Sequence, residues 1–198
     1  MLKHYSLDMI VAGCDESGRG CLAGPVVAAA VILPKSYSNN LINDSKILPS
    51  KVRCKLAECI KEESISWSVG LATVNEIDRI NILNASFLAM HRAIKKLSVK
   101  PNLLLVDGNR FNVYPNLTHK CIVKGDGKYI SIAAASIIAK NHRDNIMKNL
   151  DFNFHEYDWK NNKGYPTKKH REVLINLGPT VHHRKSFQIL PSQLSLDI

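Results

Sequence analysis

Apolar and polar residues follow one another in short blocks along the chain, and several apolar blocks have the length and composition of strands. These blocks are rich in valine, isoleucine and leucine, and glycine, proline or acidic residues stand at their ends. One block, ISWSVGL, alternates between apolar and polar residues, as a strand with one buried face does. The predicted strands cover residues 9–12, 26–33, 65–71, 103–106 and 119–123.

Other segments have apolar residues at spacings of three and four, which is the period of a helix with one buried face. Ser50 and Thr167 are suitable N-terminal caps, and Gly178 with Pro179 ends the last helix. The predicted helices cover residues 51–62, 75–79, 83–97, 130–148 and 168–177. Because strands and helices alternate, we predict a single α/β domain over residues 1–198, with a small, mostly helical C-terminal part over about 150–198.

The first two apolar blocks flank a short segment, residues 13–25, that contains two acids, one arginine and four glycines. We expect this segment to be a loop between two rigid strands, where functional residues are common. Asp15 and Glu16 directly follow the first predicted strand, and adjacent residues at a strand end point in different directions. The pair can therefore offer two ligands to one site. An ordinary acidic, glycine-rich hairpin has the same composition.

Two further acids, Asp107 and Asp126, also stand beside glycine after a predicted strand. One Asp-Gly pair is more often a turn than a ligand, but ligands gather at one edge of an α/β sheet. Clustered carboxylates raise each other's pKa unless cations lie between them, and hard oxygen ligands suit Mg²⁺ or Mn²⁺. Because two such ions serve in-line phosphoryl transfer, these residues predict a metal-dependent nuclease or phosphotransferase.

Composition agrees with a globular protein and excludes several other classes. The chain is 45% hydrophobic and 22% charged, and no apolar run approaches the roughly 18 residues of a membrane span. The N-terminus lacks the long apolar region of a secretory signal, so we expect a cytoplasmic location. Five scattered cysteines without a CxxC pair argue against a zinc site or a disulfide framework.

The formal net charge of +10 points to a polyanionic partner. Residues 160–185 hold seven lysines and arginines against one acid, Glu172, with aromatic residues among them. Such a stretch is typical of contacts to a phosphate backbone, although a solvated basic face has the same composition.

The predicted helix over residues 130–148 carries a second group of polar and basic side chains. Ser136, Lys140 and Arg143 share one face, because they stand at spacings of four and three. Beside the acids, this stripe could hold substrate phosphates. A plain amphipathic helix that exposes its charges has the same pattern.

Taken in order, blocks along nearly the whole chain resemble the bacterial ribonuclease HII family, the type 2 ribonucleases H. The blocks are GCDESGRG at 13–20 with AGP at 23–25, DSK at 44–46, VDG at 106–108, KGD at 124–126, AAASIIAK at 133–140 with RD at 143–144, KGY at 163–165 with His170, and HRKSF at 183–187. One block alone is weak evidence, but the ordered set is specific. The resemblance implies a ribonuclease H-like mixed β-sheet flanked by α-helices, with a small C-terminal helical part.

The resemblance also implies an activity. A member of this family hydrolyses the RNA strand of RNA–DNA hybrids and nicks duplex DNA on the 5′ side of an embedded ribonucleotide. The products carry a 3′-hydroxyl and a 5′-phosphate, and the reaction uses Mn²⁺ or Mg²⁺, two ions with substrate bound. Such an enzyme removes ribonucleotides and RNA primers from DNA. We expect a monomer that has no membrane partner.

Residues that match the family's metal-binding carboxylates are Asp15, Glu16, Asp107 and Asp126. We expect Asp15 to be shared by both ions. Gly18, Arg19 and Gly20 match the loop whose backbone meets the ribose 2′-hydroxyl. This role is physically reasonable, because glycine lets backbone approach a ligand closely and the 2′-hydroxyl distinguishes RNA from DNA.

Tyr165 matches the tyrosine that stacks on the sugar after the RNA–DNA junction, although a tyrosine between glycine and proline can also be ordinary loop packing. The remaining candidates are expected to contact backbone phosphates: Lys46, Ser136, Lys140 and Arg143.

Two alternatives to this activity stay open on the sequence. A non-catalytic protein could bind hybrids through its basic C-terminal third, but it would have no use for four acids at strand ends. A ribonuclease HIII-like enzyme would cut hybrids without acting on single ribonucleotides. That related family carries an extra N-terminal domain, whereas about eight residues precede the first predicted strand here, and Tyr165 also favours ribonuclease HII.

Overall fold

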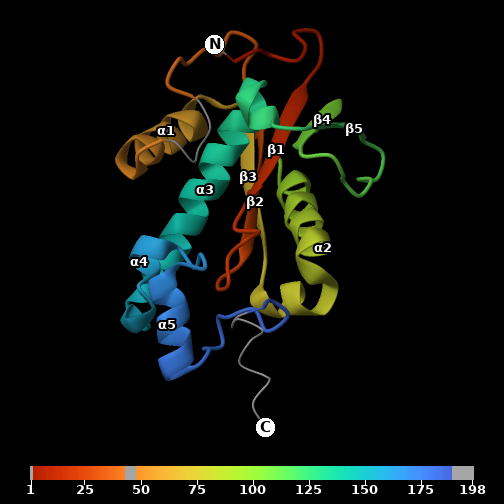
Figure 1. Ribbon diagram of the computed structural model, residues 1–198. Helices are drawn as coiled ribbons and strands as arrows, with labels where there is room; N and C mark the ends of the chain where they lie inside the picture. Colours follow the sequence, from red (N-terminus) through yellow and green to blue (C-terminus); the bar gives the residue numbers. More distant parts are fainter. Residues whose placement is uncertain (1, 43–47, 189–198) are drawn as a thin grey trace.

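A mixed five-stranded sheet forms the centre of the molecule, in the order β3-β2-β1-β4-β5 (Figure 1). The computed structural model describes residues 2–42 and 48–188. The strands are β1 Val11–Ser17, β2 Val26–Ile32, β3 Ser66–Ala72, β4 Leu103–Asp107 and β5 Thr118–Ile122. The first three strands pair antiparallel, whereas β4 runs parallel to β1 and β5 parallel to β4. The C-terminal ends of β1, β4 and β5 therefore meet at one edge of the sheet.

Helices cover both faces of this sheet, with α1 and α3 on one face and α2 on the other (Figure 1). The helices and 3₁₀ turns are α1 Ser50–Glu63, α2 Val74–Lys95, η1 Gly125–Gly127, α3 Ile130–Asp151, η2 His155–Tyr157, α4 Trp159–Asn162 and α5 Lys168–Leu177. In the described part of the chain, none of these helices combines the length and apolar character needed to cross a membrane.

Alternation along β2 explains how both faces are buried. Ala28 and Ala30 lie in the core under α2, whereas Ala29 and Val31 lie in the core under α1 and α3. Every residue of this strand is buried, so the strand has no polar face, and its small side chains let helices pack closely on both sides.

Gly13 in β1 brings the start of α3 against the sheet. A Cβ atom at this position would stand 2.1 Å from the carbonyl carbon of Ser131, so only glycine allows the approach. As a consequence, the first turns of α3 lie beside the strand that carries Asp15.

The α/β prediction is confirmed, and two predicted boundaries are wrong. The strand predicted over residues 9–12 instead continues to Ser17, because β2 pairs with it as far as Ser17 opposite Val27. The acids of the 13–25 segment therefore lie in the strand and not in a loop. The helices predicted over 75–79 and 83–97 form α2 together, with a kink at Asn81, where φ is 64°.

The C-terminal part packs on α3 and on the segment that follows β1. Trp159 is fully buried there, in a cluster with Leu22, Ala23, Met147 and Leu174. The predicted helix that Thr167 caps is α5, and the Thr167 hydroxyl accepts a hydrogen bond from the His170 amide. This packing brings residues after 159 next to the loop at residues 18–25.

Candidate active site

Asp15 and Asp107 lie side by side at the edge of the sheet where β1, β4 and β5 end. Cys14 pairs with Val106 across the parallel strands, so the two aspartates that follow stand at the same level. They line a pocket of about 200 Å³. The complete lining is Asp15, Glu16, Ser17, Gly18, Arg19, Gly20, Asp107, Ser136, Lys140 and Tyr165.

Asp126 lies beside this pocket but does not line it. We expected it at a strand end, and it lies instead in η1, four residues after β5, with 7% of its surface exposed. The Gly125 amide donates a hydrogen bond of 2.7 Å to Asp107 Oδ1, which ties η1 to the pocket. Within residues 2–42 and 48–188, no three histidine, cysteine, aspartate or glutamate side chains form a group arranged to hold a metal ion. Three of the four predicted carboxylates thus share the pocket, and the fourth is adjacent.

The electrostatics of the pocket favour a bound cation. Burial, followed by the charges of Glu16 and Asp107, raises the pKa of Asp15 well above its usual range. Burial also raises the pKa of Glu16, although Arg19 acts in the opposite direction through an ion pair of 3.2 Å. Because the acidic oxygens repel one another in a desolvated site, a positive charge between them would stabilise their ionised forms. Carboxylates of this kind fit Mg²⁺ or Mn²⁺.

In the lining of the pocket, Tyr165 stands near Lys140. The Lys140 Nζ lies 5.8 Å from the centre of the Tyr165 ring and 2.6 Å from Asp144 Oδ1. The lysine therefore keeps a charge next to the ring while a buried acid holds its position. Tyr165 is 39% exposed, so its ring is accessible to a ligand.

A chain of buried hydrogen bonds holds the backbone of Tyr165. The Tyr165 carbonyl lies 2.9 Å from His170 Nδ1, which donates to it, and His170 Nε2 is then free to accept from Trp159 Nε1 at 3.2 Å. His183 Nδ1 accepts from the Thr180 amide at 2.9 Å, and His183 Nε2 lies 3.1 Å from His170 Nε2. These contacts tie the Tyr165 backbone to the buried side chains of His170, Trp159 and His183.

One predicted substrate contact is wrong. Arg143 was expected on an exposed stripe of α3, but its side chain is 0% exposed and all three guanidinium nitrogens donate to backbone carbonyls, of Pro25, Lys163 and Ala23. It therefore supports the loop after β1 and does not face a phosphate. Lys46 lies outside the described residues.

The other two members of the predicted stripe differ in exposure. Ser136 is buried under the acids, where its hydroxyl bonds to Asp15 and lowers the pKa of that carboxyl against the larger effects that raise it. Lys140 lines the pocket.

The basic segment at 160–185 is less uniformly charged at the surface than its sequence indicates. Lys160, Lys168 and Lys169 each have a carboxylate within 4.0 Å, supplied by Asp151, Glu172 and Asp158. Two of these acids lie outside the segment, which is why the sequence window shows only one.

Sequence reasoning did not assign a role to Arg184, which is 0% exposed although it belongs to that basic segment. Its guanidinium contacts the carbonyls of the loop after β1. The HRKSF block contains this arginine, but a charge pattern cannot distinguish a buried guanidinium from an exposed one.

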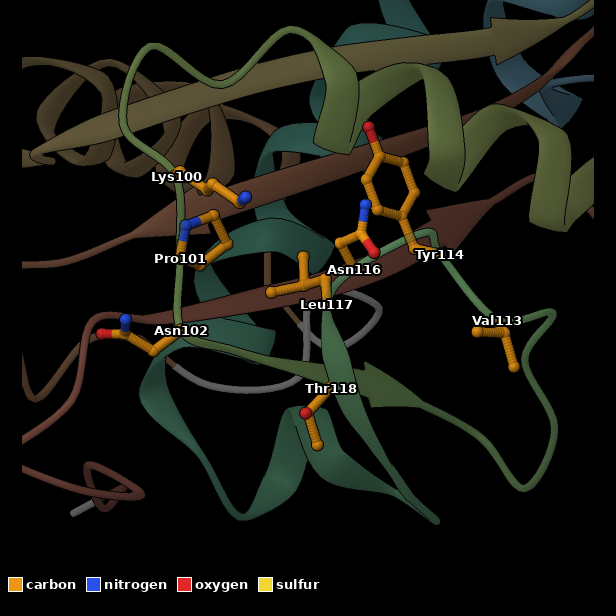
Figure 2. A pocket seen from close by; sticks show the side chains of 8 residues that line it. All are labelled: Lys100, Pro101, Asn102, Val113, Tyr114, Asn116, Leu117 and Thr118. Atoms are coloured by element: carbon orange, nitrogen blue, oxygen red, sulfur yellow. The ribbon is translucent and has the colours of Figure 1, made fainter.

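A larger hollow of about 640 Å³ lies away from the acids, at the end of the sheet where β4 begins (Figure 2). Its lining is Lys100, Pro101, Asn102, Val113, Tyr114, Asn116, Leu117 and Thr118. It contains neither an acid nor a histidine, and Figure 2 shows its side chains spread over the segments that lead into β4 and β5. This hollow offers no group for phosphoryl transfer.

Known proteins resemble this chain over nearly its whole length. A family model described as ribonuclease HII matches residues 12–190. The ribonuclease HII of Bacteroides thetaiotaomicron is 57% identical over 198 residues, which cover 100% of this chain and 99% of the relative.

Two solved structures share the fold. The ribonuclease H2 of Pyrococcus horikoshii OT3 has a TM-score of 0.74 and 28% identity, covering 91% of this chain and 95% of that one. The Archaeoglobus fulgidus ribonuclease HII, solved in complex with PCNA, has a TM-score of 0.75 and 28% identity, with coverages of 90% and 95%. The predicted ribonuclease H-like fold is thereby confirmed, and the chain belongs to the ribonuclease HII family of hydrolases.

Proposed function

We propose that this protein cuts the RNA strand of RNA–DNA hybrids and nicks duplex DNA on the 5′ side of an embedded ribonucleotide, leaving a 3′-hydroxyl and a 5′-phosphate. Membership of the family makes it a ribonuclease H endonuclease that depends on a divalent metal. The observation that carries the finer proposal is the composition of one pocket. Asp15 and Asp107 stand there beside the Gly18–Gly20 loop and the accessible ring of Tyr165.

In this proposal, the four acids would hold two divalent cations, and Asp15, whose carboxyl interacts with both Glu16 and Asp107, would be the ligand that the two cations share. When bound, such cations neutralise the scissile phosphate, provide an activated water and stabilise the leaving oxygen. The raised pKa of Asp15 supports the assignment, since a group held in this way by burial and like charges gains most from a nearby cation.

The other pocket residues select and hold the substrate. The backbone of Gly18–Gly20 reads the 2′-hydroxyl, and the Tyr165 ring stacks on the next sugar. Lys140 and Ser136 line the same pocket, where they would contact a phosphate of the cleaved strand. Recognition of the sugar and hydrolysis of the phosphate then take place in one cleft. A monomer suffices, because every group comes from one chain.

The test is cleavage of an end-labelled DNA duplex that contains one ribonucleotide, in Mn²⁺, in Mg²⁺ and in EDTA. We expect one nick on the 5′ side of the ribonucleotide with either metal and none in EDTA, with a 3′-hydroxyl on the upstream fragment and a 5′-phosphate on the downstream fragment. The Asp107→Asn variant serves as the matched control, because it removes one charge and keeps the shape of the side chain.

A continuous RNA–DNA hybrid, run in parallel, separates the alternatives. Cleavage of the hybrid without nicking at the single ribonucleotide would assign a ribonuclease HIII-like activity instead. Binding of both duplexes without cleavage in either metal would contradict the proposed hydrolysis altogether.

A further inference from the structure

Arg184 is bound to the inner side of the loop that follows β1. Its Nη2 donates to the Gly18 carbonyl at 2.6 Å, and its Nη1 donates to the Arg19 carbonyl at 2.8 Å. Nε and Nη2 also donate to the Gly24 carbonyl, at 3.0 and 2.9 Å. Burial lowers the pKa of this guanidinium to about 10, so the side chain keeps its charge at neutral pH.

These contacts fix the direction of two amides. A trans peptide unit is planar, and its N–H points opposite to its C=O. Because the Gly18 and Arg19 carbonyls both face Arg184, the N–H groups of Arg19 and Gly20 point away from it, toward the side of the loop that lines the pocket. In the described part of the chain, neither amide donates to another protein group. The space beside Gly20 is also open, since no atom lies within 4 Å of a Cβ built there.

We propose that Arg184 is the positioning residue for ribose recognition: by holding the Gly18 and Arg19 carbonyls, it aims the Arg19 and Gly20 amides at the 2′-hydroxyl. Arginine suits the task because its planar fork presents five donors in fixed directions. A lysine has a single charged nitrogen and cannot hold two successive carbonyls in the same geometry. The inference rests on the proposed function, since it concerns the same pocket.

Arg143 in α3 provides a matched control, because its side chain binds the same loop. It is equally buried and donates to the carbonyls of Ala23, Pro25 and Lys163, but to neither Gly18 nor Arg19. Loss of either arginine weakens the packing around the loop. Only loss of Arg184 releases the two peptide units whose amides face the pocket.

The experiment measures ribose preference in the Asp107→Asn background, as the ratio of dissociation constants for an all-DNA duplex and for the same duplex with one ribonucleotide. We expect Arg184→Lys to reduce this ratio at least threefold while affinity for the all-DNA duplex stays within twofold. Arg143→Lys should keep the ratio. Thermal unfolding of both variants shows that each is measured in its folded state.

A second measurement leaves Arg184 in place. In ¹⁵N-labelled Asp107→Asn protein, the Arg19 and Gly20 amide signals should shift more with the ribonucleotide duplex than with the all-DNA duplex.

A ratio unchanged by Arg184→Lys, equal losses in both arginine variants, or amide signals that do not distinguish the duplexes would each overturn the inference. If Arg184→Lys does not fold, the amide signals alone decide. Failure of the proposed function is distinguishable, because the protein with both arginines intact would then show no ribose preference.

Discussion

At the scale of single residues, two glycines of the same loop are required for different reasons. Gly18 has a φ of +98°, and a Cβ there would stand 2.0 Å from Arg143 Nε. Gly20 does not have a left-handed φ, and the space beside it is open. Gly18 is therefore needed for the conformation of the loop, whereas Gly20 keeps space free for a ligand.

The two alanine variants should consequently differ: Gly18→Ala should lose stability, whereas Gly20→Ala should lose activity. Gly18→Ala should lower the free energy of unfolding by about 1–3 kcal/mol, because the backbone is strained and Arg143 must move. Gly20→Ala should unfold as the unmodified protein does, but nick a single ribonucleotide at least about tenfold more slowly, a loss of about 1.4 kcal/mol. Urea unfolding and single-turnover nicking measure the two effects. Equal nicking by Gly20→Ala and the unmodified protein would contradict the role given to its open side.

Tyr165 allows a similar separation of ring and hydroxyl. Tyr165→Ala removes the ring and should slow nicking at a single ribonucleotide by about tenfold to a hundredfold, as expected for a lost stacking contact of about 1–3 kcal/mol. Tyr165→Phe keeps the ring and should lose less. Mn²⁺ binding, measured by calorimetry, should be retained in both variants, since the acids are untouched. Unchanged nicking by Tyr165→Ala would remove the ring from the proposal.

At the scale of elements, the start of α2 is fixed by a reciprocal cap. The Thr73 hydroxyl accepts from the Glu76 amide, and Glu76 Oε2 accepts from the Thr73 amide at 2.9 Å. Arg92, four turns later in the same helix, donates to both Glu76 oxygens at 2.6 and 2.8 Å. Because the helix is kinked at Asn81, these bonds join the halves on either side of the kink.

This arrangement predicts a pH dependence. The hydrogen bonds from Arg92 are the largest cause that lowers the pKa of Glu76, from 4.5 to about 2. The unfolded chain thus binds the proton more tightly, so the stabilisation is complete above pH 4.5 and is lost as the pH falls toward 2. Glu76→Gln keeps a capping side chain, and we expect it to cost about 1 kcal/mol at pH 7, a small value because the ion pair is partly exposed.

Urea unfolding at pH 7 and pH 3 checks this prediction, since the difference between Glu76→Gln and the unmodified protein should shrink at the lower pH. Glu58→Gln is the control, because Glu58 forms its ion pair with Lys61 at a more exposed site. A difference that is the same at both pH values would disprove the linkage.

At the scale of the whole molecule, the excess of positive charge should govern binding more than any single contact does. With a net charge of +10, the protein should release counterions when it binds a duplex, so affinity should fall by at least about tenfold between about 50 and 200 mM salt. Fluorescence anisotropy with Asp107→Asn measures the affinity at several salt concentrations, which gives the slope of log affinity against log salt concentration. Lys140→Met should reduce the slope by about 0.9, whereas Lys100→Met, in the hollow of Figure 2, should not. Equal slopes for both variants would contradict a phosphate contact by Lys140.

The alternating blocks were sufficient to predict the α/β class, because the spacing of apolar residues indicates whether a strand or helix is buried on one face or on two. The acids could be singled out for the same reason: Asp15 and Asp107 each come after a run of apolar residues. The order of the strands could not be predicted, since it depends on contacts between distant segments. The exposure of Arg143 and Arg184 could not be predicted either, because a guanidinium surrounded by carbonyls has the same local sequence as one in water.

The bond between Arg184 and Gly18 spans 166 positions of the chain, and this separation has a consequence for protein synthesis. At about 5–20 residues per second, a ribosome makes the arginine roughly 8–33 s after the loop that it holds. All four acids, of which Asp126 is the last, enter the nascent chain before Arg184 does, whereas the loop proposed to read the sugar is not held until the arginine is present. A growing chain would therefore gain its proposed metal ligands before its selectivity, and discrimination between RNA and DNA would be the last property to mature.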